Sequence, residues 1–165
     1  MILNTKVKST DVTLLKDTKV IERKGYISIN YGNNFIDDND EITLISELEL
    51  EDGLLSLEIK IGFSYKRSCV RCLSLSSNNE TNQLSSKVNI YEENDFELNH
   101  DDEYFDLEPI ISEMIIDKMQ NNFICAVQCK GLCTYCGINL TIESCNCKEK
   151  NLKESPFSSL SQLDL

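Results

Sequence analysis

The chain of 165 residues contains one histidine, two prolines, three arginines and no tryptophan. No stretch approaches the run of about 18 apolar residues that a transmembrane helix needs, so we do not expect a membrane span. The first residues, Met1–Lys6, lack the basic region and apolar run of a secretory signal. We therefore expect a cytoplasmic protein, whose thiols stay reduced.

The sequence also offers little for catalysis. His100, the only histidine, lies among Asn99, Asp101 and Asp102, where a solvated side chain is expected rather than a general base. Without a second histidine, no Cys–His catalytic pair can form elsewhere. There is no glycine-rich phosphate loop and no spaced pair of carboxylates apart from the acidic runs. We therefore expect that the protein is not an enzyme and has no small-molecule substrate.

The net charge of −12 is unevenly distributed. Residues 37–58 contain nine acids, residues 88–117 contain eleven, and neither stretch has a lysine or arginine. Such runs are usually solvated faces, and an acidic surface repels nucleic acid. Between residues 59 and 79 there is no acid, and the basic residues are Lys60, Lys66, Arg67 and Arg71. Because these cations gather near Cys69 and Cys72, we expect an anionic partner there.

Alternating apolar residues predict an antiparallel hairpin in the middle of the chain. The alternation runs over residues 42–50 and again over 55–65, with Glu51-Asp52-Gly53 between the two runs. Alternation interrupted by a turn with glycine is typical of a hairpin with one buried face. A polar Ser/Asn stretch over residues 74–82 follows, and then a returning strand over residues 84–91.

A stripe of apolar residues predicts one helix over residues 107–120. Asp106 can cap its N-terminus, and Pro109 falls in the first turn, where a missing N–H costs little. The stripe most simply covers the buried face of the sheet, and a docking surface for a partner helix is the alternative. It consists of Leu107, Ile110, Ile111, Met114, Ile115 and Met119.

These patterns predict an α+β fold. We expect mainly antiparallel sheet, or a partial barrel, with one packed helix and a small C-terminal cysteine-rich zinc appendage. The sheet body should cover residues 1–122, with weaker strands near residues 2–7 and 26–31. A zinc-binding segment over residues 123–150 and a polar tail over residues 151–165 should follow.

Eight cysteines are the clearest chemical signal, and in a reduced protein they favour metal over disulfides. Cys133 and Cys136 form a C-x2-C pair, followed by Gly137, which can adopt a positive φ. Cys145 and Cys147 lie two residues apart, so in an extended segment they point to the same side. Together these four thiols predict a closed zinc site.

The other four cysteines predict a second site. Cys69-x2-Cys72 and Cys125-x3-Cys129 would join the end of the hairpin to the segment after the helix. The spacing leaves other partitions open, including one zinc with four spare thiols, and also allows an iron–sulfur cluster. A thioredoxin-like redox motif fits less well, because neither C-x2-C pair opens a helix after a parallel strand.

Several motifs occur in an order that is found in one known family. Cys69-Val70-Arg71-Cys72-Leu73 comes first, followed by Asp106-Leu107-Glu108-Pro109. Residues 129–140 then read C-K-G-L-C-T-Y-C-G-I-N-L, and Cys145-Asn146-Cys147 follows. With these motifs the chain resembles the YceD family, the large ribosomal RNA subunit accumulation proteins of bacteria and plastids. The resemblance covers about residues 55–147 and hardly extends to residues 1–40.

The resemblance implies a cytoplasmic, non-enzymatic factor needed for processing or accumulation of 23S ribosomal RNA. Family genes often neighbour that of a large-subunit ribosomal protein, which fits a role in subunit assembly. The family often has a D-P-R motif before its leucine-rich tail, whereas this chain has Ser155-Pro156-Phe157. Some members lack most of the cysteines, so the metal would stabilise this branch without performing the shared function.

Our leading hypothesis is a bacterial zinc-binding factor, holding one or two Zn²⁺ ions, that engages ribosomal RNA or a protein of the large subunit. The acidic faces suit a basic ribosomal protein. A thiol redox or zinc-responsive regulator is the alternative function. Arginine and lysine neutralise phosphate charge, so the candidate RNA contacts, for which ordinary surface charge is the alternative, are Lys66, Arg67, Arg71 and Lys130.

Overall fold

The computed structural model describes residues 1–13, 18–96, 98, 103–119 and 122–147. Its largest element is a six-stranded antiparallel sheet built around one long strand, β6 (Leu54–Ser68). The strand β7 (Leu75–Asn89) pairs with β6 along one side, and β5 (Ile42–Glu51) and then β4 (Asn34–Ile36) pair along the other. The sheet is completed by β2 (Lys19–Gly25) beside β5 and β3 (Ile29–Tyr31) beside β4.

The predicted central hairpin is confirmed. In it β5 and β6 are joined by Asp52 and Gly53, whose φ angles of 50° and 82° fit the two-residue turn that favours Asp-Gly. Every second residue of β6 from Leu55 to Tyr65 is buried, which places one face of the hairpin in the core. Each such aliphatic side chain contributes about 2 kcal/mol by leaving water.

The strand after the first cysteine pair is longer than the sequence predicted. The structure pairs residues 75–89 with β6 as one continuous strand, so the polar stretch over residues 74–82 is not a separate connection. In this polar half of β7, backbone pairing with β6 and hydrogen bonds of the asparagine side chains take the place of an apolar face. Asn82 Nδ2 donates to the Met114 carbonyl at 2.8 Å, and the Ser64 hydroxyl donates to Asn79 Oδ1 at 2.7 Å.

The first forty residues contain more structure than their weak alternation indicated. The strand predicted near residues 2–7 is reduced to β1 (Lys6–Lys8), which pairs with β8 (Tyr104–Asp106) in a separate two-stranded sheet. The strand predicted over residues 26–31 is β3 alone. The short helix α1 (Ser9–Thr13) and the strands β2 and β4 were not predicted, because none of them has a long apolar face.

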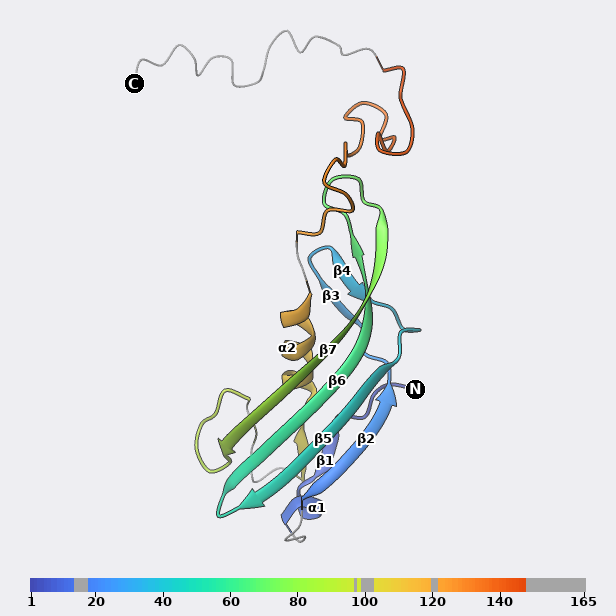
Figure 1. Ribbon diagram of the computed structural model, residues 1–165. Coiled ribbons are helices and arrows are strands. Elements are labelled where there is room, and N and C mark those ends of the chain that lie inside the picture. Colours follow the sequence, from blue (N-terminus) through green and yellow to red (C-terminus); the bar gives the residue numbers. More distant parts are fainter. Residues whose placement is uncertain (14–17, 97, 99–102, 120–121, 148–165) are drawn as a thin grey trace, which may run out of the picture.

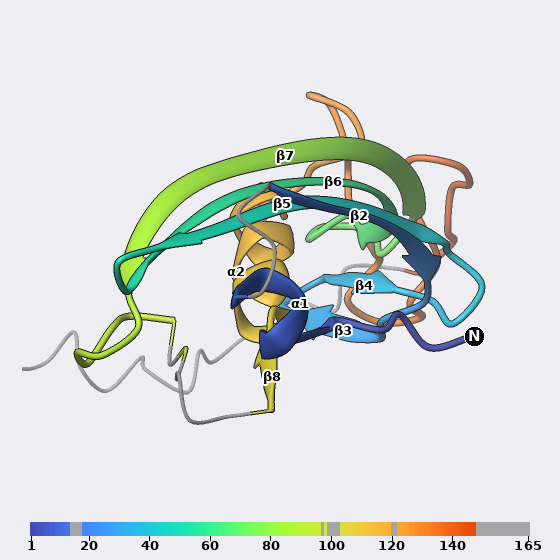
Figure 2. The ribbon, with the colours of Figure 1, turned by 90° about the horizontal axis from the view of Figure 1, so that it is seen from below.

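The predicted helix is confirmed as α2 (Glu108–Lys118). The six stripe residues from Leu107 to Met119 are all buried, and they join the sheet residues in one core. Figure 2 shows β5, β6 and β7 arching over α2, so the helix covers the concave face of the sheet. This architecture confirms the α+β fold, with mainly antiparallel sheet and one packed helix.

The capping of α2 differs from the prediction by one residue. Leu107, not Asp106, occupies the N-cap position. Even so, Asp106 Oδ1 accepts the Glu108 N–H at 3.0 Å and the Thr5 hydroxyl at 2.8 Å. The carboxylate therefore still satisfies a free N–H of the first turn, and it also ties the helix to the N-terminal strand.

Residues 122–147 lie beyond the end of the sheet, next to the turn that joins β6 to β7 (Figure 1). None of the described helices is long and apolar enough to cross a membrane. His100, the last three residues of the predicted zinc segment and the predicted tail over residues 151–165 lie outside the described residues.

Candidate metal centre

The structure gathers the eight cysteines into two groups of four. We call Cys69, Cys72, Cys125 and Cys129 the strand-turn tetrad, and Cys133, Cys136, Cys145 and Cys147 the C-terminal tetrad. Within each tetrad the four sulfur atoms all lie within 4.8 Å of one another. All eight cysteines are free thiols, so each tetrad offers four ligands of one chemical kind. The two groups have the same members as the two sites that the spacing favoured.

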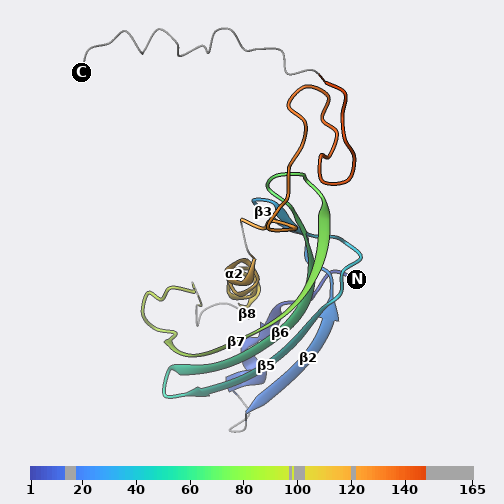
Figure 3. The same ribbon diagram turned by 45° about the horizontal axis from the view of Figure 1, so that its top comes forward.

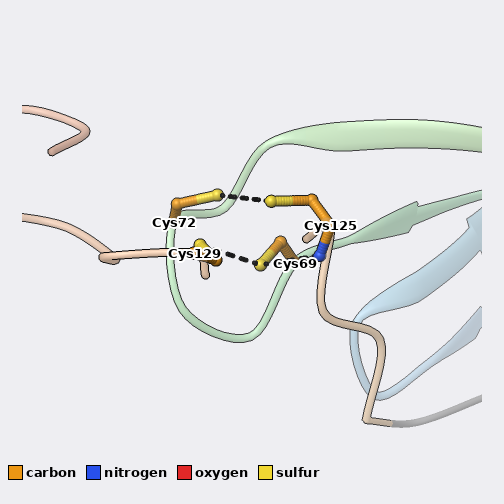
Figure 4. Close-up of side chains that lie close together, drawn as sticks. All are labelled: Cys69, Cys72, Cys125 and Cys129. Atoms are coloured by element: carbon orange, nitrogen blue, oxygen red, sulfur yellow. Dashed lines mark hydrogen bonds between the residues drawn. The ribbon is translucent and has the colours of Figure 1, made fainter. Parts of the chain in front are cut away.

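The separations of the sulfur atoms fit one tetrahedral ion in each tetrad. Zn–S bonds of about 2.3 Å place the sulfurs of a tetrahedron about 3.8 Å apart. The Sγ atoms of Cys69 and Cys129 are 3.9 Å apart, and those of Cys72 and Cys125 are 3.5 Å apart (Figure 4). A disulfide would require about 2.05 Å. An iron–sulfur cluster would place several atoms between the sulfurs and would therefore need wider spacing.

The two C-x2-C pairs adopt the same backbone turn. In each, the first cysteine donates its N–H to the carbonyl five residues later, and the residue four positions later donates to the carbonyl of that cysteine. The bonds are Cys69 N–H to Ser74 O (2.9 Å), Leu73 N–H to Cys69 O (2.9 Å), Cys133 N–H to Ile138 O (2.8 Å) and Gly137 N–H to Cys133 O (2.9 Å). Both turns need a left-handed residue, which is Leu73 (φ 58°) in the first and Gly137 (φ 74°) in the second.

Backbone N–H groups favour the ionised form of Cys69 in the strand-turn tetrad. Burial opposes ionisation, but the N–H groups of Cys125, Cys72 and Arg71 outweigh it and lower the pKa of Cys69 to about 6. The Ser74 hydroxyl, 3.1 Å from Cys72 Sγ, lowers the pKa of Cys72. Contact with Cys72 in turn raises the pKa of Cys125 to about 12. The four thiols resist simultaneous ionisation, and a divalent cation would offset this repulsion.

The C-terminal tetrad repeats this electrostatic pattern. The N–H groups of Cys136 and Tyr135 lower the pKa of Cys133 to about 6. Contact with Cys136 raises the pKa of Cys147 to about 12. The Sγ atoms of Cys133 and Cys145 are 3.4 Å apart. Cys133 is buried, whereas Cys136 is exposed. This tetrad is therefore a similar site that lies nearer the solvent.

The two arginines predicted to contact RNA connect the two segments of the chain that carry the strand-turn tetrad. The Arg67 guanidinium lies 4.0 Å from the centre of the Phe123 ring, and Val70 donates its N–H to the Phe123 carbonyl at 3.0 Å. Arg71 Nη1 donates to the Cys129 carbonyl at 3.2 Å. Both arginines thus join the β6–β7 turn to the segment after α2. These contacts do not test binding of RNA, which stays a prediction.

The two lysines predicted to contact RNA have different surroundings. Lys66 pairs with Asp37, and this hydrogen bond raises the pKa of Lys66. Its ammonium group also lies 6.0 Å from the centre of the Phe35 ring. Lys130 is exposed beside the tetrads, and its backbone N–H donates to the Thr141 hydroxyl at 3.0 Å. Lys66 therefore already has an anionic partner, whereas Lys130 faces the solvent.

The segment that carries the C-terminal tetrad packs against the turn of the strand-turn tetrad. Leu132 donates its N–H to the Arg71 carbonyl at 3.2 Å, and Asn139 Nδ2 donates to the Ser74 hydroxyl at 3.1 Å. Gly131 has φ 77°, and a Cβ there would lie 3.1 Å from the Arg71 carbonyl oxygen. These contacts explain why Gly131 and Asn139 occur in the motif over residues 129–140. Spacing alone did not reveal the contacts of Phe123 with Arg67 and Val70 or that of Asn139 with Ser74, because these partners are distant in the sequence.

Comparison with known proteins gives one family match. No curated protein and no solved structure matches the chain. The family model described as large ribosomal RNA subunit accumulation protein YceD matches residues 57–164. The matched region includes both tetrads, α2, all of β7 and nearly all of β6. The chain therefore belongs to the YceD family.

Proposed function

We propose that the chain is a zinc-binding, non-enzymatic factor that supports the processing or accumulation of 23S ribosomal RNA and the assembly of the large ribosomal subunit. The observation that carries the role is the family match over residues 57–164. We place the protein in the bacterial cytoplasm, where free thiols persist. Its partner is ribosomal RNA or a protein of the large subunit.

Two Zn²⁺ ions are the metals that these residues suit best. Four thiolates around one point form a closed site of the kind that structural zinc occupies, with no position left for a substrate. The strand-turn tetrad would hold the β6–β7 turn to the segment after α2, and the C-terminal tetrad would hold the loop over residues 133–147. The metal would thus order the end of the molecule that carries Arg71 and Lys130.

Complementation of a strain that lacks the gene tests the role. We expect the deletion to lower the ratio of 23S to 16S ribosomal RNA, and the wild-type protein to restore that ratio and to sediment with large-subunit particles. The double variant Cys69→Ser/Cys72→Ser should fail to restore it, whereas Glu49→Gln, an exposed substitution on β5, should succeed. A normal ratio in the deletion strain, without sedimentation on particles, would refute the proposal.

Elemental analysis of the purified native chain tests the metal separately. We expect about two zinc ions per chain, one for each tetrad. A folded chain without metal, whose cysteines form disulfides reversibly under cytosolic redox conditions, would instead favour the thiol redox regulator. About two iron ions per chain would support metal binding by the tetrads but would refute zinc as the metal.

A further inference from the structure

The two longest edge strands of the sheet are protected to different degrees. Edge strands expose unpaired backbone groups, and proteins usually blunt them with charged residues or proline. The edge strand β2 carries four charged residues in seven, Lys19, Glu22, Arg23 and Lys24. In contrast, β7 has fifteen residues, of which only Glu80 and Lys87 are charged, and no proline. Within the described residues, β7 pairs with β6 alone.

A groove runs beside the middle of β7. It has a volume of about 630 Å³ and lies between β7 and α2, which Figure 3 shows nearly end-on at the concave side of the sheet. Asn82 bridges its two walls, because its Nδ2 donates to the Met114 carbonyl at 2.8 Å and its Oδ1 accepts the Gln83 N–H at 2.9 Å. The groove thus has a backbone edge as one wall and a helix as the other.

The lining of the groove is apolar and acidic. Two exposed carboxylates of α2, Glu113 and Asp117, lie along it, and none of the residues lining it is a lysine or arginine. The apolar part of the lining includes Leu84, Phe96, Ile110 and Ile116. Residues 88–117, which contribute much of this wall, contain eleven acids and no lysine or arginine. The groove therefore suits an occupant that has both apolar and cationic side chains.

We propose that the β7 edge and this groove bind an extended, cationic segment of a partner protein, which adds a strand to the sheet. The partner's backbone would pair with β7, and every second side chain would face the groove. These groove-facing side chains would include both apolar residues and a lysine or arginine that pairs with Glu113 and Asp117. A second copy of the chain fits poorly, because each copy brings a net charge of −12. This site is distinct from the tetrads and goes beyond the proposed function.

A labelled ten-residue peptide tests the chemistry of the site when added to the zinc-loaded full chain. Its alternate positions are valine and lysine in turn, with serine between them, so that one face of the strand carries both apolar and cationic side chains. We expect saturable binding in fluorescence anisotropy and slower hydrogen exchange of β7 amides. Two control peptides should bind at least about tenfold more weakly, a difference of about 1.4 kcal/mol. One has glutamate in place of lysine, and the other has every backbone nitrogen methylated, which keeps the side chains and removes the hydrogen-bond donors.

Charge reversal locates the site on the molecule. We expect Glu113→Lys/Asp117→Lys to weaken binding of the lysine–valine peptide about tenfold, because the new lysines repel the cationic peptide. The matched control, Glu22→Lys/Glu49→Lys, makes the same change in net charge at exposed positions of β2 and β5 and should have less than about a twofold effect.

Several outcomes would overturn the proposal. These are no binding of the lysine–valine peptide, equal binding of the methylated peptide, or equal weakening by both charge reversals. Dimerisation of the chain through β7 in sedimentation equilibrium would also overturn it. The peptide comparison uses the wild-type chain, so it decides the matter even if a variant fails to fold, and no readout depends on the ribosome.

Discussion

At the scale of single residues, Leu73 and Gly137 occupy the same position in the two C-x2-C turns. Both are left-handed, and this conformation costs a residue with a side chain about 1 kcal/mol. The side chain of Leu73 is 59% exposed, so its removal loses little apolar burial. We expect Leu73→Gly to raise the free energy of unfolding of the zinc-loaded chain by roughly 0.5–1 kcal/mol, measured by urea denaturation.

Leu73→Ala is the matched control for this substitution. Alanine removes the same side chain but keeps the Cβ that makes the left-handed conformation costly. The alanine variant should therefore show no gain in stability. If both variants were equally stable, the strain at position 73 would not be the cause.

The two glycines near the C-terminal tetrad should respond differently to alanine. Both have positive φ, so each substitution costs about 1 kcal/mol of backbone strain. At Gly137 nothing lies within 4 Å of the added Cβ, whereas at Gly131 the Arg71 carbonyl oxygen lies at 3.1 Å. We expect Gly131→Ala to destabilise the zinc-loaded chain more than Gly137→Ala in urea unfolding. Equal losses would show that seating on the Arg71 turn adds nothing.

The pairing within each C-x2-C motif was predictable, and the spacing favoured the two tetrads but left other partitions open. The residues that support the tetrads were not predicted. A C-x2-C pair brings two sulfurs together by local geometry alone, so Cys69 with Cys72 and Cys133 with Cys136 follow from spacing. The arginines between and beside these pairs were predicted as phosphate contacts. In the structure Arg67 stacks on Phe123 and Arg71 bonds the Cys129 carbonyl. Such pairings depend on the tertiary fold, which no local pattern records.

At the scale of elements, the start of α2 depends on one carboxylate. Asp106 accepts hydrogen bonds from the Glu108 N–H and from the Thr5 hydroxyl. We expect Asp106→Ala to lower the free energy of unfolding by about 1–2 kcal/mol, because both donors lose their acceptor. Asp106→Asn keeps an acceptor oxygen and should lose less. Chemical denaturation monitored by circular dichroism measures both, and equal losses would point to charge rather than hydrogen bonding.

The elements that bury a regular apolar face were predictable from the sequence. The β5–β6 hairpin and α2 show the periods of two and 3.6 residues that such faces require. Half of β7 was missed because its serines and asparagines carry no such period, and its conformation follows from pairing with β6. The strand β2 was missed for a related reason, since its side chains alternate only between exposed and half-buried positions.

At the scale of the whole molecule, the two tetrads should depend on each other unequally. The C-terminal tetrad is seated on the Arg71 carbonyl and on Ser74, both of which belong to the turn of the strand-turn tetrad. We therefore expect Cys69→Ser/Cys72→Ser to loosen both tetrads. In contrast, Cys145→Ser/Cys147→Ser should leave the strand-turn tetrad metal-bound. Elemental analysis should find about one zinc in the second variant and less than one tightly held zinc in the first.

Hydrogen exchange provides the control for this comparison. In both variants the amides of β5 and α2 should stay protected, because their core does not include the cysteines. Loss of protection there would mean that the first variant unfolds globally. Equal zinc content in the two variants would contradict the unequal dependence.

The strand-turn tetrad also has a consequence in time. It joins Cys69 to Cys129, which lie sixty positions apart, and every strand of the larger sheet precedes Cys125. A chain made from its N-terminus can pair those strands before the second half of the tetrad has been synthesised. A metal could therefore close the site only after residue 129 has emerged. A chain that stops short of residue 125 retains only two of the four cysteines, so a metal held by the whole tetrad would mark chains that extend at least to residue 129.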